Sequence, residues 1–152
     1  MLLSPSSFTD AVGGRKRIPQ AGKIVRTVGR ATTTPLETFG SPTVRVDTVT
    51  ASGGWSRIVA VLSALLPGGK ELVVGGGGVP TVAGRHTYTI GFNSTATFIP
   101  KGSKLVLSIG SSSLAQNPAD LLYLDLPMPA GARLSIGAIR LRLPVLPVPV
   151  SR

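Results

Sequence analysis

From Lys23 onward, turn-forming residues divide the sequence into apolar and threonine-rich segments of about five to ten residues. The 152 residues include 19 Gly and 13 Pro, enough to place a turn or a strand end between successive segments. Helices need longer periodic segments, whereas short strands joined by turns are typical of sandwiches and barrels. The spacing therefore predicts an all-β fold, with residues 1–22 as an irregular lead-in and residues 23–150 as a single β-sandwich domain.

Two segments illustrate the strand pattern. In residues 43–51 the even-numbered side chains from Val44 to Thr48 share one face, as expected for a half-buried strand. Residues 84–100 form a long threonine- and aromatic-rich segment, in which Asn93-Ser94 predicts a bulge or bend. Counting such segments, we expect seven to nine strands in two packed sheets and no long helix.

The last long strand is predicted over residues 132–146. Its alternation of apolar and polar side chains changes phase at Ala138-Ile139, which indicates a β-bulge. Prolines lack the amide hydrogen that a sheet ladder needs. We therefore expect the tail, with Pro144, Pro147 and Pro149, to leave the sheet.

Residues 61–81, VLSALLPGGKELVVGGGGVPT, hold a glycine cluster that could be mistaken for a phosphate-binding loop. A Walker loop needs G-x-x-x-x-G-K-[ST], but Ala64 occupies its first position and Glu71 its last. The dinucleotide fingerprint G-x-G-x-x-G does not occur here either. The cluster instead predicts a hairpin turning at Pro67–Gly69, after which we expect Gly75–Gly78 to leave the sheet as a loop.

The residue inventory gives no autonomous active site. The absence of Cys excludes disulfides, thiol catalysis and cysteine-type zinc sites. No serine has the flanking glycines of a G-x-S-x-G nucleophile elbow, and His86 is the only histidine. The six acidic residues are scattered, without a pairing signal for glycoside hydrolysis or metal binding. We predict no catalytic residues, no metal and no cofactor.

The chain is strongly basic, with 16 Lys and Arg against six Asp and Glu and a net charge of +10. Such a charge suits an anionic partner. Basic residues are nevertheless scattered apart from Arg15–Arg17, and aromatic residues make up only 5%, which disfavours a stacking platform for nucleic acid. No segment has the length of a membrane span, and residues 1–17 do not match a secretory signal, so a cytoplasmic location is favoured.

Candidate contact residues lie in predicted loops and at a strand start. Trp55 follows Gly53-Gly54, and its large ring with one N–H donor suits an interface. Ser111, Ser112 and Asn117 belong to a polar cluster after an apolar strand, where sandwich loops often carry contacts.

The order of segments also resembles a known family. The segments that carry the resemblance are TPLETFGSPTVRV, WSRIVAVLSALLPGGK, HTYTI and TATFIPKGSKLVLSIGSSS. In this order, over about residues 31–146, the series resembles the C-terminal non-catalytic domain of Xaa-Pro dipeptidyl-peptidases, cocaine esterase-like hydrolases and α-amino-acid ester hydrolases.

The resemblance implies a jelly-roll β-sandwich, similar to galactose-binding domains, that packs on an α/β-hydrolase domain and shapes substrate access or assembly. The expected partner is thus such a catalytic domain, in the same or another chain, or a second copy of this chain. Two alternatives come from the residues themselves: a stand-alone carbohydrate- or peptide-binding module, and a basic nucleic-acid-binding protein.

Overall fold

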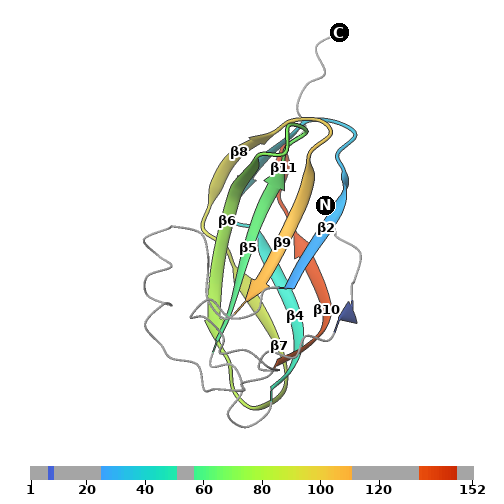
Figure 1. Cartoon of the computed structure of the whole chain (residues 1–152). Coiled ribbons are helices and arrows are strands. Elements are labelled where there is room, and N and C mark those ends of the chain that lie inside the picture. Colours follow the sequence, from blue (N-terminus) through green and yellow to red (C-terminus); the bar gives the residue numbers. More distant parts are fainter. Residues whose placement is uncertain (1–6, 9–24, 51–56, 111–133, 147–152) are drawn as a thin grey trace.

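The computed structural model describes residues 7–8, 25–50, 57–110 and 134–146, and all statements below concern these residues (Figure 1). They form strands and connecting turns, without a helix and hence without a helix able to cross a membrane. The strands are β1 (Ser7–Phe8), β2 (Val25–Ala31), β3 (Leu36–Gly40), β4 (Thr43–Thr50), β5 (Arg57–Leu65), β6 (Glu71–Pro80), β7 (Gly84–Gly91), β8 (Thr95–Ile99), β9 (Lys104–Gly110), β10 (Leu134–Arg142) and β11 (Val145–Leu146).

The strands build two layers. One is a four-stranded antiparallel sheet in the order β2-β9-β5-β6, here called the front sheet because it faces the viewer in Figure 1. Behind it lie a four-stranded sheet, β1-β10-β4-β7, and a three-stranded sheet, β11-β3-β8. The all-β sandwich predicted from the sequence is thereby confirmed.

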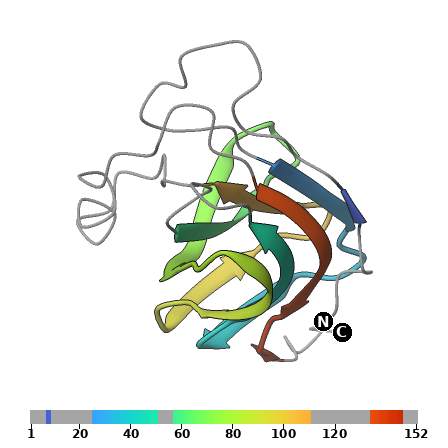
Figure 2. The same ribbon diagram turned by 90° about the horizontal axis from the view of Figure 1, so that it is seen from below.

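The two rear sheets run end to end. Along the chain β3 continues into β4, β7 into β8 and β10 into β11, so the strand order β10-β4-β7 is repeated as β11-β3-β8. The three connections are only two to three residues long, and Figure 2 shows the curved path from β10 into β11. Phe39 N donates to Pro144 O (3.3 Å) and Phe92 N to Pro42 O (2.9 Å) across the bend. We call the two rear sheets together the bent layer.

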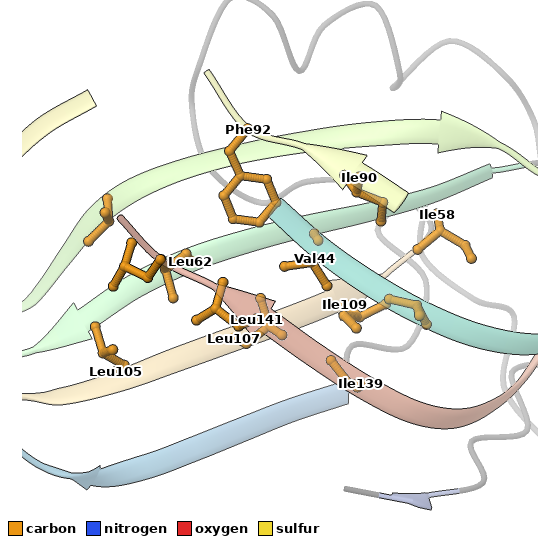
Figure 3. Packing of buried hydrophobic residues seen from close by; sticks show 14 of the residues in the cluster. Val44, Ile58, Leu62, Ile90, Phe92, Leu105, Leu107, Ile109, Ile139 and Leu141 are labelled. Atoms are coloured by element: carbon orange, nitrogen blue, oxygen red, sulfur yellow. The ribbon is translucent and has the colours of Figure 1, made fainter. Parts of the chain in front are cut away.

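Alternation along the strands supplies one shared core between the layers (Figure 3). From the front sheet come Ile58, Leu62, Leu105, Leu107 and Ile109, among others, and from the bent layer Val44, Ile90, Phe92, Ile139 and Leu141. Most of these side chains have no solvent exposure, so burial of both inner faces holds the layers together.

Two crossovers between the layers lie against each other at one end of the sandwich. The segment between β2 and β3 contains Thr32, and the turn between β8 and β9 contains Pro100, Gly102 and Ser103. Thr32 N donates to Ser103 O (2.8 Å), Gly102 N donates to Thr32 O (2.9 Å), and Thr32 Oγ1 donates to Pro100 O (3.2 Å). Gly102 has φ +84°, which the tight turn requires and other residues adopt at a cost.

Several local predictions are confirmed. In β4 the side chains of Val44, Val46 and Thr48 are buried while the intervening ones are more exposed. The β10 ladder shifts register between Ile136 and Ile139, the bulge that the phase change indicates. The hairpin of β5 and β6 also forms.

The expectation that Gly75–Gly78 leave the sheet is wrong. These glycines lie inside β6 and pair with β5, with Gly75 opposite Leu62 and Gly78 opposite Val59. A methyl group on Gly77 would lie 2.2 Å from the carbonyl oxygen of Gly91, at the end of β7. At this position glycine allows the backbones of the two layers to approach each other closely, and it does not mark the end of the strand.

The bend predicted at Asn93-Ser94 is confirmed: residues 84–100 form two strands, β7 and β8, of different rear sheets, and residues 92–94 lie between them. Two further expectations need correction. Pro144 does not release the tail: it lies between β10 and β11, and β11 pairs again with β3. The described residues also contain eleven strands instead of seven to nine, two of them only two residues long.

Candidate functional site

The contact residues predicted from the sequence, Trp55, Ser111, Ser112 and Asn117, all lie outside the described residues. The apolar segment LLYLDLP (121–127), whose pattern predicts a strand, lies outside them as well. These assignments stay predictions, and the candidate site is sought on the strands.

His86 has a structural environment. Its Nε2 lies 2.9 Å from the carbonyl oxygen of Ala83, within the turn that precedes β7. Its ring centroid lies 5.9 Å from that of Tyr88, whose hydroxyl accepts a hydrogen bond from Val82 N (2.9 Å). Gly84 follows the turn with φ +105°. His86 and Tyr88, which are two residues apart on β7, thus both hold the turn between β6 and β7 in place.

Two hydroxyl–carboxylate pairs occur on the strands, and neither has the arrangement of a catalytic triad. Ser63 Oγ donates to Glu71 Oε1 (2.5 Å) across the β5–β6 hairpin of the front sheet. Thr87 Oγ1 donates to Asp47 Oδ1 (2.6 Å) across β4 and β7. A Ser–His–acid arrangement needs the imidazole between hydroxyl and carboxylate. In both pairs the hydroxyl bonds the acid directly, so they stabilise strand pairing.

Metal binding has no support within the described ranges either. Among these residues no group of three or more His, Asp or Glu side chains comes together. The strands of the described part also carry exposed side chains, which could contact other molecules.

One exposed surface is the outer face of the bent layer, opposite the core. Its apolar end carries Phe39 (60% exposed), Phe98 (55%) and Leu146 (44%). Glu37 pairs in register with Phe98 on one side and Leu146 on the other, which places these side chains on one face. Two of the chain's four phenylalanines are thus directed to solvent.

The other end of the same face is basic. Arg45 on β4 pairs in register with Arg140 on β10, and Arg142 follows on the same face of β10. All three side chains are exposed. Sequence reasoning missed this surface, although Phe39 falls in phase with the exposed odd-numbered positions of 43–51. That phase relation was the available signal.

Comparison of the chain with family models and with curated proteins gives no match. Solved structures do match. An α-amino acid ester hydrolase aligns over 90% of this chain at 18% identity and TM-score 0.62, and a CocE/NonD family hydrolase from Staphylococcus aureus over 93% at 9% identity and TM-score 0.64. An aminopeptidase from a marine sediment archaeon, Thaumarchaeota archaeon, aligns over 79% at 15% identity and TM-score 0.57.

The matched part is a minority of each of those proteins. This chain spans 28% of the ester hydrolase, 37% of the Staphylococcus aureus hydrolase and 25% of the archaeal aminopeptidase. The resemblance seen in the sequence to cocaine esterase-like and α-amino-acid ester hydrolases is thus found again in the fold. The chain is a β-sandwich with the fold of one portion of these hydrolase chains.

Proposed function

We propose that the chain is the non-catalytic accessory domain of a serine hydrolase of ester-hydrolase or Xaa-Pro dipeptidyl-peptidase type. The observation that carries the proposal is the coverage of the structural matches. About nine-tenths of this chain aligns with little more than a third, or less, of two hydrolase chains. A sandwich that corresponds to one part of a hydrolase is expected to act together with the rest of such an enzyme, which would hold the catalytic domain.

The chemistry of the described residues supports a non-catalytic role. His86 is engaged in a turn, and the hydroxyl–carboxylate pairs of Ser63 and Asp47 serve strand pairing. The nucleophile, base and oxyanion donors that ester or peptide hydrolysis requires would then come from the partner α/β-hydrolase domain. The sandwich would contribute by shaping the substrate entrance or by stabilising the assembly.

The test combines the purified chain with α/β-hydrolase polypeptides of the same genome that contain G-x-S-x-G. Turnover of p-nitrophenyl esters and of Xaa-Pro p-nitroanilides is measured for each component alone and for the mixture. We expect no turnover by the chain alone, and a higher kcat/KM or a higher melting temperature of one hydrolase in the mixture.

Turnover by the chain alone, accompanied by labelling of one of its serines with a fluorophosphonate, would contradict the non-catalytic role. If no hydrolase of that genome changes in activity or stability, the accessory role itself is refuted. A His86→Gln variant serves as the control, since loss of its turn contact should leave the activity of the mixture unchanged.

A further inference from the structure

The outer face of the bent layer is one continuous surface with two chemistries. On the path from β3 to β4 the odd-numbered residues from Glu37 to Val49 point away from the core, without interruption at the bend. Phe39 and Arg45 therefore lie on the same face of the same path. On β10 and β11, Arg142 and Leu146 are related in the same way.

The apolar end is a departure from ordinary strand patterning. Outward positions of a solvated sheet are usually polar, but Phe39, Phe98 and Leu146 are each at least 44% exposed. They flank Glu37 across three neighbouring strands, so they form one patch and not scattered exposures. Apolar patches with a polar rim on a protein surface mark interaction sites.

The basic end is a second, independent departure. Like charges directly opposite each other on neighbouring strands destabilise a sheet, yet Arg45 stands opposite Arg140. In the described structure neither arginine forms an ion pair, and the nearest acid on β4, Asp47, accepts a hydrogen bond from Thr87. An unfavourable pair of exposed arginines is retained at low cost if a carboxylate-bearing partner neutralises it.

From these two observations we infer that the outer face of the bent layer is a docking surface for a protein that presents carboxylates beside an apolar contact. The arginines would pair with the carboxylates, since guanidinium groups bind them in a bidentate manner. Phe39, Phe98 and Leu146 would be covered by the apolar contact, as in the cores of protein interfaces. On the proposed function, which this step deepens, the partner is the catalytic domain.

Charge also decides between candidate occupants. A second copy docked about a two-fold axis near the arginines would bring Arg45, Arg140 and Arg142 against their own equivalents, and an axis nearer to the bend would place them over the copy's apolar end; neither arrangement gives the complementarity of charge that an acidic partner offers. A nucleic acid would satisfy the arginines but would leave the phenylalanine and leucine side chains facing a phosphate backbone. A protein surface that carries carboxylates beside apolar side chains complements both the basic end and the apolar end.

The first test uses two defined polymers and an RNA as probes for the full chain. Poly(Glu,Tyr) offers carboxylates with apolar rings, poly(Glu) offers carboxylates alone, and poly(U) offers phosphates. By fluorescence anisotropy at low salt we expect poly(Glu,Tyr) to bind about tenfold more tightly than poly(Glu), equivalent to about 1.4 kcal/mol. The variant Arg45→Glu/Arg140→Glu should lose most binding of both acidic polymers, and Phe39→Ser/Phe98→Ser only the advantage of poly(Glu,Tyr).

Matched controls carry the same changes elsewhere. Lys70→Glu/Lys101→Glu alters the net charge equally at exposed turns, and Val28→Ser/Val82→Ser removes exposed apolar side chains outside this face. If the controls weaken binding as much as the face variants, or if poly(U) binds more tightly than poly(Glu,Tyr), the proposal is overturned. Circular dichroism of each variant verifies that it is folded.

The second test identifies the partner with the photo-crosslinking residue p-benzoylphenylalanine in place of Phe39 or Phe98, and in place of Val28 as control. We expect crosslinks from the first two to an acidic segment of a hydrolase chain, mapped by mass spectrometry. Crosslinks to a hydrolase from Val28 alone would overturn the docking face but keep the accessory role. Crosslinks from Phe39 and Phe98 to an acidic protein other than a hydrolase would keep the face and refute the accessory role. Crosslinks to RNA or to a second copy overturn the docking proposal.

Discussion

Gly77 is the residue at which a single added carbon should cost most. It lies inside β6, with Gly91 O only 2.2 Å from the position of a methyl group and Ile90 Cγ2 3.3 Å away. Both neighbouring atoms belong to β7, and the nearer one is a backbone oxygen that a side-chain rotation cannot move. The substitution Gly77→Ala must therefore push the front sheet away from the bent layer. We expect a loss of about 1–3 kcal/mol in the free energy of unfolding, typical of overpacking. Urea denaturation measures it.

Gly91→Ala is the matched control for Gly77→Ala. It adds the same methyl group at the other end of the same contact, but nothing lies within 4 Å of the new carbon. The control should change stability by less than about 0.5 kcal/mol, as surface substitutions do. Equal losses for the two substitutions would show that the close approach of β6 to β7 does not set the cost, because the lower backbone entropy of alanine in the unfolded chain acts in the stabilising direction at both positions.

At the residue scale the sequence predicted positions that follow alternation and missed those that depend on distant neighbours. Val44 and Thr48 are buried as expected because each strand face repeats every second residue. Gly102 lies in the segment PKGSK, whose proline and glycine predict the tight turn that the structure has, with φ +84°, whereas nothing local places Gly77 in a strand against β7. The exposed position of Phe39 was missed because the alternation of residues 43–51 was not extended back across Gly40.

The element-scale feature with a measurable consequence is the cross-strand pair between β4 and β10. Arg45 and Arg140 are in register, so replacing one charge by its opposite converts a repulsive pair into an attractive one. Arg140→Glu should therefore raise the free energy of unfolding of the isolated chain by about 0.5 kcal/mol. The gain should shrink when NaCl is raised to about 0.5 M, since exposed pairs are screened.

Lys101→Glu makes the same change of net charge in the turn before β9 and controls for relief of overall repulsion. A gain for Lys101→Glu equal to that for Arg140→Glu would refute the pair-specific explanation. On the docking proposal, Arg140→Glu should also weaken poly(Glu,Tyr) binding. Stability and binding would then change in opposite directions, as expected where a surface is kept unfavourable for a partner.

At the scale of the whole molecule, strand existence could be predicted but the pairing of strands could not. Asn93-Ser94 predicted a bulge or bend within residues 84–100, but nothing in the sequence indicated that the bend places the two halves in different sheets. At the bend, the carbonyl oxygens of Pro42 and Pro144 accept hydrogen bonds from Phe92 and Phe39, residues far away from them in the sequence. The outer face that we propose for docking exists only because of that alignment.

The shared core predicts how the whole molecule unfolds. Buried side chains of the front sheet, such as Leu62 and Leu107, belong to the same cluster as Val46 of the bent layer. If one layer unfolds, the apolar inner face of the other layer becomes exposed to water, so we expect the two layers to unfold together. In hydrogen exchange at increasing urea, we expect amides of the interior strands β4, β5 and β9 to share one large urea dependence. Amides of β8 and β11, at the sheet edges, should exchange earlier by local opening. A smaller urea dependence for β4 than for β5 and β9 would show that the bent layer is a separate cooperative unit.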